Sequence, residues 1–383
     1  MRLTVTLPLA SFFERVARSL ETIRERRGLL PCVLACGAIL LVCAGIYVRP
    51  SLPVFPDNLV GGARFYEVLA ADPLAFDTLV SFRVLVPLLA HVVGLGAERL
   101  PYFNLILVYA VICVIFFHYL KRYEDALLPF AITAAMSLTM PVLYGVYDLW
   151  ALETGRVLCV MLMVMARNRQ PVFWALFAVS LFVHDGDVFL LPFLVLLQFA
   201  LRKSLASFLI GTGLGVGIAL GLYLPFNWLI GERLVALGVG SMDAASRLSL
   251  FFNDPLSYMR FGLWSAYDSV FATYKLFWLV IAAGVYYAFR AGDRLWALVI
   301  AAAPASAALQ FISGAELFRY LVIGFPGLIF SIEVLAQRFG HRLVAQVILH
   351  LTLVNLFVPQ QLVWGNAIGK MQNLFHMLMF WTF

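Results

Sequence analysis

Charged residues are scarce in this chain, and that scarcity excludes an ordinary soluble domain. Only 13% of the 383 residues are Asp, Glu, Lys or Arg, whereas 63% are hydrophobic. Soluble domains contain about 25% charged and about 45–50% apolar residues. The mean hydropathy is +0.93. Apolar runs of about 15–20 residues predict helices that span a bilayer.

Several chemical signatures are also missing. None of the five cysteines lies in a predicted outer loop, where a disulfide would stabilise the fold. Cys32 and Cys36 share a helix face, so they either pack in the bundle or hold a metal ion. The sequence contains no Walker loop, dinucleotide fingerprint, zinc-ligand spacing or nucleophile elbow. Basic residues are not interleaved with aromatic ones, so the net charge of +6 does not indicate a nucleic-acid partner.

Basic residues are concentrated in every second gap between the apolar runs. These places are Arg26–Arg27, Lys121–Arg122, Arg167/Arg169, Arg202–Lys203, Arg290/Arg294 and Arg338/Arg342. The other gaps contain carboxylates and aromatic residues. Basic loops of membrane proteins stay in the cytoplasm. The sequence therefore predicts an all-α, polytopic membrane protein with a cytoplasmic N-terminus and a polar outer face.

The predicted organisation is a single transmembrane domain with two flanking segments. Residues 1–28 form an amphipathic cytoplasmic segment, residues 29–358 the transmembrane domain, and residues 359–383 an apolar tail at the interface or in a further span. About eleven spans are predicted: 29–48, 101–120, 126–145, 149–166, 171–183, 187–201, 205–226, 274–289, 295–313, 320–337 and 343–358. Outer loops are expected at about 49–100 and 227–273.

Two apolar segments carry more specific predictions. Residues 83–96 are too short to span and would move every later basic pair to the outside, so they are predicted to lie in the outer interface. The run GTGLGVGIALG, from Gly211 to Gly221, contains small residues at four-residue spacing. Such spacing allows a neighbouring helix to approach closely.

Carboxylates near the predicted outer boundary are candidates for chemistry. Asp57, in the first outer loop, could act as a general base toward an acceptor hydroxyl or hold a divalent cation; alternatively, PDN is only a turn. Asp148 could line a cavity or cap a helix.

The HDGD segment interrupts a 30-residue apolar stretch. His184, Asp185 and Asp187 could bind Mg²⁺ or Mn²⁺, or they could form a solvated turn between two short helices.

Arginines in this region could hold phosphate. Arg319 could pair with Glu316 or grip a phosphate with its planar guanidinium. Arg83 could be a second phosphate contact or a snorkelling side chain.

Three further ionisable residues lie inside predicted spans. Glu153 and Arg156 are close enough along one helix to pair with each other. Glu333 is expected to pair with a cytoplasmic arginine rather than serve as a proton relay.

Four stretches in chain order resemble the GT-C class of integral membrane glycosyltransferases. They are FFHYLKRYED, LYGVYDLWALETGRVLCVMLMVMARNRQ, ALFAVSLFVHDGDVFLLPFLVLL and ELFRYLVIGFPGLIF. An acidic residue early in the first outer loop and interfacial helices within that loop complete the resemblance, which covers roughly residues 29–335. Members of the class often carry an adjacent acidic pair in that loop, and this chain does not.

The resemblance, which is to the short bacterial members of the class, implies a location in the bacterial inner membrane. It implies sugar transfer at the periplasmic face, from a polyprenyl-phosphate donor to a periplasmic or lipid-linked hydroxyl. It implies Asp57 as the catalytic base and Arg319 as a donor-phosphate contact, with Asp148 and the His184–Asp187 turn lining the cavity. The expected partners are the lipid-linked donor, membrane lipids and other membrane proteins. Two alternatives come from other classes: a transporter or flippase for a lipid-linked or small anionic solute, and a non-catalytic membrane assembly subunit.

Overall fold

The computed structural model describes residues 10–48, 63–77, 81–150, 152–202, 204–238, 266–313, 317–358, 361–364 and 367–370. Within these residues the chain is helical except for one antiparallel strand pair. Asp57 and Glu316 lie outside the described residues, so their predicted roles stay predictions. Most of the predicted outer loop at 227–273 and of the tail also lies outside them.

The helices follow the apolar runs of the sequence. In the first half they are α1 (Ala10–Arg27), α2 (Leu29–Tyr47), α3 (Ala63–Ala71), α4 (Leu85–Val92), η2 (Ala97–Arg99), α5 (Leu100–Arg122), α6 (Leu127–Ser137), α7 (Met140–Tyr147), α8 (Glu153–Met165) and α9 (Gln170–Val183). In the second half they are η3 (Asp185–Leu190), α10 (Leu191–Leu201), α11 (Leu205–Ala236), α14 (Ala266–Tyr274), α15 (Phe277–Arg290), α16 (Arg294–Leu309), η5 (Gln310–Ser313), α17 (Leu317–Leu321), η6 (Val322–Gly324), α18 (Pro326–Phe339) and α19 (His341–Phe357). The strands are β1 (Gln361–Trp364) and β2 (Ala367–Lys370).

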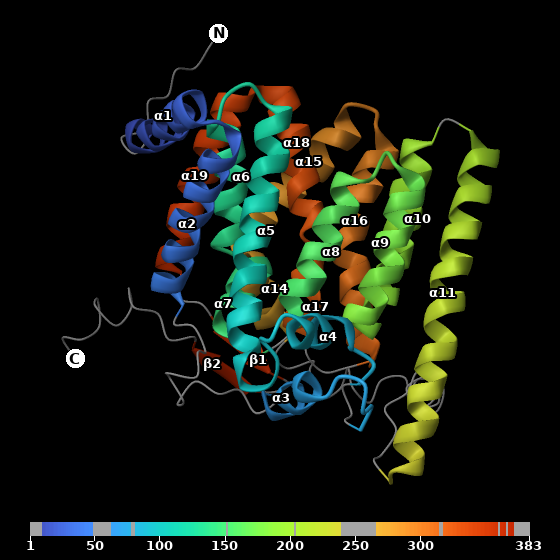
Figure 1. Cartoon of the computed structure of the whole chain (residues 1–383). Coiled ribbons are helices and arrows are strands. Elements are labelled where there is room, and N and C mark those ends of the chain that lie inside the picture. The colour runs from blue at the N-terminus through green and yellow to red at the C-terminus, as the bar shows by residue number, and fades with distance from the viewer. Residues whose placement is uncertain are drawn as a thin grey trace.

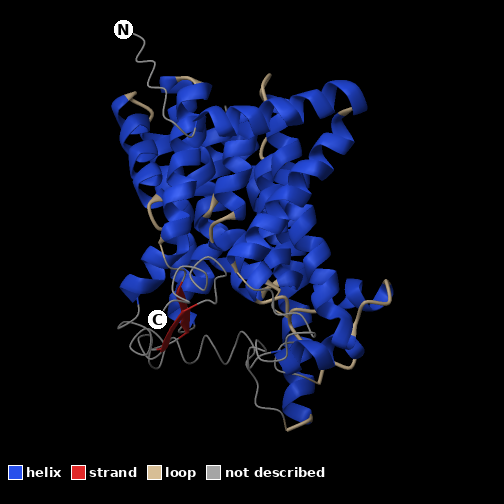
Figure 2. Cartoon of the chain, turned by 90° about the vertical axis from the view of Figure 1, so that its left-hand side faces the viewer, coloured by secondary structure: helices blue, strands red, loops and turns tan. Residues whose placement is uncertain are grey.

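The long helices run side by side as one bundle, and short elements lie at its two ends (Figure 1). α1 packs on α2 at one end, which we call the α1 end. α3 packs on α4 at the opposite end, the α4 end, and the strand pair lies toward the same end (Figure 2). All 11 residues of α6 are buried in the middle of the bundle, as expected for a helix that is apolar on every side.

The apolar helices are those of an all-α membrane protein. Among the described residues, four helices are long and apolar enough to cross a bilayer, and six if each of two bent pairs counts as one span. Three more apolar helices, α9, α16 and α19, have 10–17 residues. The count of about eleven spans stays a prediction.

The segment predicted to lie in the interface is short in the structure as well. α4 has 8 residues, and at 1.5 Å per residue it extends about 12 Å, less than half the hydrocarbon core. In Figure 1 it lies across the end of the bundle rather than along it. The chain between α2 and α5 therefore contains no described helix that could cross a membrane.

Basic residues from loops far apart in sequence gather at the α1 end. The Glu333 carboxylate on α18 forms ion pairs with Arg122 Nη1 at 2.6 Å and with Arg167 Nη2 at 3.2 Å. Arg342 on α19 donates to Glu14 on α1 at 2.6 Å, and this hydrogen bond lowers the pKa of Glu14. The pairing predicted for Glu333 is confirmed, and these basic loops share one side of the bundle. That this side faces the cytoplasm stays a prediction.

Two helix pairs are bent at breaks, by 50° between α6 and α7 and by 81° between α14 and α15. Lys275 occupies the second break in a left-handed backbone conformation, with φ 49°. Its ammonium donates to the carbonyls of Asn355 (3.0 Å) and Val358 (2.8 Å) and to the Tyr47 hydroxyl (2.7 Å). The last carbonyls of a helix carry partial negative charge, so the ammonium stabilises the end of α19. The break thereby joins α2, α19 and the α14–α15 pair.

α11 is the longest helix and packs chiefly on α9. A side chain at Gly215 would overlap Trp174 of α9, whereas no atom lies within 4 Å of the corresponding position at Gly217. The predicted close approach along the glycine run is confirmed on this one face of the helix. The predicted end at residue 226 is wrong, because Pro225 is accommodated inside the helix and the following residues continue it to Ala236.

The far end of α11 holds the segment that precedes α4. Phe82 packs with Ile230 and Leu234 in a small buried cluster. Arg233 Nε also donates to the Ala75 carbonyl at 2.7 Å. The backbone immediately before Arg83 is therefore fixed against α11.

One ion pair is buried completely between α8 and η3. Arg156 Nε lies 2.7 Å from Asp187 Oδ1, and both side chains are 0% exposed. Arg156 Nη2 also donates to Gln310 Oε1 at 2.8 Å, which brings α16 and η5 to the same point. Gly186 leaves the space that Gln310 fills, because a side chain there would overlap the Gln310 amide. The pair thus joins three parts of the bundle.

We expect Gly215→Leu to destabilise the protein by about 1–3 kcal/mol, because the new side chain overlaps Trp174. Gly217→Leu, on the same helix, places the same side chain in open space and is the matched control. Thermal unfolding of both variants in one detergent measures the difference. Equal melting temperatures would show that α11 does not dock on α9 through Gly215.

We expect Asp187→Asn to destabilise the protein by about 3–5 kcal/mol, because it leaves the Arg156 charge buried without its carboxylate. The control is Arg342→Gln, which breaks a pair whose arginine is 73% exposed and should cost at most about 1 kcal/mol. Chemical unfolding in mixed micelles compares the two variants. A cost for Asp187→Asn as small as that of the control would contradict the structural role of the buried pair.

Candidate functional site

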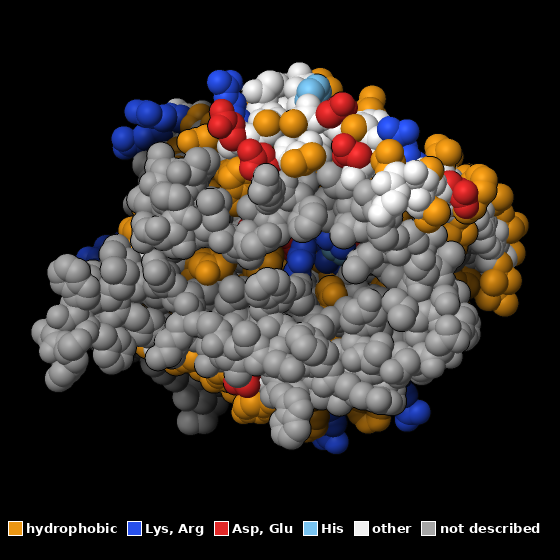
Figure 3. All heavy atoms as spheres, turned by 90° about the horizontal axis from the view of Figure 1, so that it is seen from below, with side chains coloured by type: hydrophobic (Ala, Val, Ile, Leu, Met, Phe, Trp, Pro, Cys, Tyr) orange, Lys and Arg blue, Asp and Glu red, His pale blue; other side chains and the backbone are white. Residues whose placement is uncertain are grey.

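Three arginines meet three carboxylates at the α4 end of the bundle. We call this group the three-arginine cluster: Arg83, Arg156 and Arg319 with Asp185, Asp187 and Glu153. Its members come from the segment before α4, from α8, from η3 and from α17. Figure 3 looks onto this end, and basic side chains are visible near the middle of the face. Four segments far apart in sequence therefore contribute to one polar site.

Tyr66 on α3 connects two of the arginines. Its hydroxyl accepts from Arg83 Nη1 at 2.7 Å and lies 3.5 Å from Arg319 Nη2. Arg83 Nε is also 3.1 Å from Asp185 Oδ1, and Arg319 Nε donates to Glu153. The phenol oxygen thus marks a point on which two guanidinium groups converge.

Exposure divides the cluster into two parts. The side chains of Arg83, Asp185 and Arg319 are 14%, 12% and 19% exposed, whereas Arg156 and Asp187 are fully buried. A ligand arriving from outside the bundle can reach the first three groups. The buried pair lies behind them and fixes η3, on which Asp185 is carried.

The HDGD segment begins the 3₁₀-helix η3. His184 Nδ1 lies 3.0 Å from the Gly186 amide nitrogen, which donates to it, and 3.3 Å from Asp185 Oδ1. His184 is 1% exposed, and the side chain of Asp187 is fully buried. The alternative of a solvated turn is therefore wrong, because the ion pairs of both aspartates hold the segment inside the protein.

One predicted pairing within the cluster is wrong, and another falls outside the described residues. Glu153 and Arg156 do not pair along α8: Glu153 accepts from Arg319, and Arg156 binds Asp187. Glu153 and Arg156 lie one turn apart on α8 but point to different neighbours. The partner of Glu153 comes from α17 and the partner of Arg156 from η3. The predicted pair of Arg319 with Glu316 stays a prediction, because Glu316 lies outside the described residues.

Asp148 does not cap the helix that follows it. It lies directly after α7, while α8 begins only at Glu153 with Leu152 at the N-cap position. The carboxylate accepts from the Trp150 amide at 3.2 Å and from the Tyr144 hydroxyl at 3.4 Å. An aspartate that binds the amide two residues ahead stabilises a turn. The role of Asp148 in lining a cavity stays a prediction.

The proposed metal ligands each face an arginine. Asp185 pairs with Arg83 and Asp187 with Arg156. Among the described residues, no group of three or more His, Cys, Asp or Glu side chains is arranged to hold a metal ion. A cation at either carboxylate would compete with a guanidinium already in place. Binding of Mg²⁺ or Mn²⁺ at Asp185 and Asp187 stays a prediction.

The cluster retains unused hydrogen-bonding capacity. Glu153 Oε2, Asp187 Oδ2 and Arg156 Nη1 are buried without a hydrogen-bond partner in the described part of the chain. Buried polar atoms of this kind are usually satisfied by ordered water or by a ligand. Arg83 uses Nε and Nη1 in its contacts, and none of the described residues accepts from its Nη2.

Sequence analysis did not identify Tyr66 or Gln310 as members of the site. Tyr66 lies on a short helix of mixed composition, where a tyrosine is unremarkable. Gln310 follows the apolar helix α16, and a buried amide in such a position is costly unless it is paired. That signal was available in the sequence, although it does not reveal that Arg156 is the partner.

Comparison with known proteins identified no relative of this chain. No family model, curated protein or solved structure matches the chain.

Proposed function

We propose that the protein is a membrane glycosyltransferase that moves a sugar from a polyprenyl-phosphate donor to an acceptor hydroxyl. In this proposal the bundle crosses the bacterial inner membrane about eleven times. The α1 end faces the cytoplasm and the three-arginine cluster faces the periplasm. The resemblance of four ordered sequence stretches to the GT-C class supports the proposal, and so does the chemistry of the cluster.

The convergence of Arg83 and Arg319 on the Tyr66 hydroxyl is the observation that carries the proposal. Guanidinium groups offer planar pairs of donors that match phosphate oxygens. Both arginines are partly exposed, and carboxylate partners hold them in position before a ligand arrives. A phosphate at this point would meet two preorganised cations next to a hydroxyl donor.

The chemical step follows from these groups. The acceptor oxygen forms a bond to the anomeric carbon while the bond from that carbon to the phosphate oxygen breaks. Asp57 takes the acceptor proton, and polyprenyl phosphate leaves with the bonding electrons. Arg83 and Arg319 stabilise the charge that develops on the departing phosphate. A divalent cation near Asp185 would add to this stabilisation.

The positions of charge favour a transferase over a transporter. Secondary transporters place ionisable groups and broken helices near the membrane midplane between matching halves. The two arginine-rich groups of this chain lie toward the α1 end and the α4 end, and the sequence contains no internal repeat.

We expect Asp57→Asn to lower sugar transfer by about 100-fold or more, because general base catalysis contributes a factor of this size. The assay follows labelled sugar from a polyprenyl-phosphate donor to acceptor with purified protein. Asp72→Asn is the control, since Asp72 is an exposed carboxylate of the same predicted loop. Donor binding with no transfer by the unsubstituted protein would contradict the proposal and favour a transporter.

We expect Arg83→Lys to raise the KM for the donor by roughly tenfold, because lysine keeps the charge but loses the guanidinium fork. Arg169→Lys, an exposed arginine at the opposite end, should leave the KM unchanged. Initial rates at varied donor concentration measure both variants. A normal KM for folded Arg83→Lys would remove Arg83 from the donor site.

A further inference from the structure

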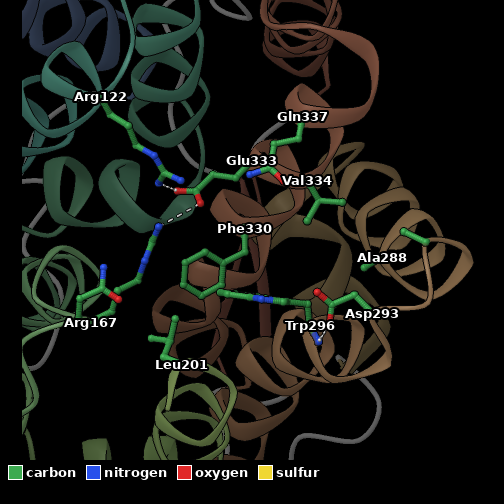
Figure 4. A pocket seen from close by; sticks show the side chains of 12 residues that line it. Arg122, Arg167, Leu201, Ala288, Asp293, Trp296, Phe330, Glu333, Val334 and Gln337 are labelled. Carbon is green, nitrogen blue, oxygen red and sulfur yellow. Dashed lines mark hydrogen bonds and ion pairs between the residues drawn. The ribbon is translucent and has the colours of Figure 1, made fainter. Parts of the chain in front are cut away.

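A polar cavity lies at the α1 end, away from the three-arginine cluster. It has a volume of about 300 Å³ and opens between α5, α8, α10, α15, α16 and α18. Arg122, Arg167 and Glu333 form one side, and Trp296 and Phe330 form another (Figure 4). The chemistry proposed for the α4 end makes no use of these residues.

Two guanidinium groups share one carboxylate in this cavity. Glu333 accepts from Arg122 at 2.6 Å, from Arg167 at 3.2 Å and from the Tyr119 hydroxyl at 3.1 Å. Its two oxygens thus serve two positive charges. Asp293 also lines the cavity, but its carboxylate accepts from the Trp296 amide and caps the N-terminus of α16. The arginine side of the cavity therefore keeps an excess of positive charge.

Arg167 still has a donor to offer. Its side chain is 12% exposed, and its Nη1 atom is buried with no hydrogen-bond partner in the described part of the chain. The guanidinium carbon lies 5.3 Å from the centre of the Phe330 ring, which holds the group in orientation. A buried, charged donor without an acceptor is unfavourable, so the site favours a ligand that supplies anionic oxygen.

The side of the cavity next to Arg167 is aromatic. The rings of Trp296 and Phe330 are 5.4 Å apart at 79°. Trp296 is partly exposed. Tryptophan is enriched where a membrane protein meets lipid headgroups, since one edge is apolar and the other can donate a hydrogen bond. The cavity thus offers cationic donors beside an apolar wall at one end of the bundle.

We propose that this cavity binds the phosphate group of an anionic ligand between Arg122 and Arg167. Basic pockets between transmembrane helices hold the headgroups of acidic phospholipids in this way. Free phosphate presents the same oxygens, so the lipid and the soluble ion are two sources of one chemistry. Glu333 competes with the phosphate for both guanidinium groups and limits its affinity.

The test uses full-length protein in nanodiscs of phosphatidylcholine alone, or of phosphatidylcholine and phosphatidylglycerol in equal parts. Native mass spectrometry after release into detergent counts the phosphatidylglycerol that stays bound. Inorganic phosphate, titrated into the phosphatidylcholine nanodiscs by calorimetry, is the second arm. Retention of phosphatidylglycerol assigns a lipid source, and binding of phosphate alone assigns a soluble one. Absence of both overturns the proposal.

Three variants separate this cavity from general surface charge. Arg167→Gln should weaken retention about fivefold or more, whereas Arg169→Gln, an exposed arginine two residues along, should have no effect. Glu333→Gln should strengthen binding, because it removes the competing carboxylate. Equal losses for Arg167→Gln and Arg169→Gln, or weaker binding by folded Glu333→Gln, overturn the proposal. If Arg167→Gln does not fold, Arg167→Lys replaces it, because it keeps the charge and loses the paired donors.

Discussion

Among the described residues, the pair of Arg156 with Asp187 is the strictest case of a buried charge that requires an oppositely charged partner. Both side chains are inaccessible to solvent, so each charge offsets the cost of desolvating the other. Because they lie on α8 and η3, and Gln310 joins them beside α16, the need for pairing also determines how these three elements sit together. The pair holds η3 in place, and η3 carries Asp185, the partner of the more exposed Arg83.

The same requirement gives the two ends of the bundle different chemical characters. At the α4 end, each of three arginines has its own carboxylate, and the groups are held in position with little net charge. At the α1 end, two arginines divide the single carboxylate of Glu333. The first arrangement suits orientation of a reacting group, and the second suits capture of an additional anion.

Sequence patterns predicted the helical membrane class, the shared side of the basic loops and the pairing of Glu333. These features follow from hydropathy and from the cost of charge in lipid, which act locally along the chain. The partners of Glu153 and Arg156 were beyond such reasoning. Each partner lies on a segment more than 30 positions away, whereas the sequence suggested only that Glu153 and Arg156 pair with each other along one helix. The junction at Lys275 likewise depends on where α19 ends in space.

Some errors had a local cause that can be named. The helix predicted over residues 205–226 is longer in the structure, because α11 accommodates Pro225 and continues to Ala236. Asp148 was expected to cap the following helix, but it lies at the C-terminal end of α7, and α8 begins only at Glu153. In both places the sequence predicted the helix and misplaced its boundary.

α11 has a mechanical consequence for the site. Only 11% of the residues in its most apolar stretch are buried, so in a bilayer most of this stretch would face lipid. Its far end nevertheless clamps Phe82 and the Ala75 carbonyl, in the segment that leads to Arg83. A change in bilayer thickness or lateral pressure that displaced α11 sideways would therefore also displace the segment before α4. The position of the Arg83 guanidinium would change with it. The lipid environment and the geometry of the arginines are thereby coupled through one helix.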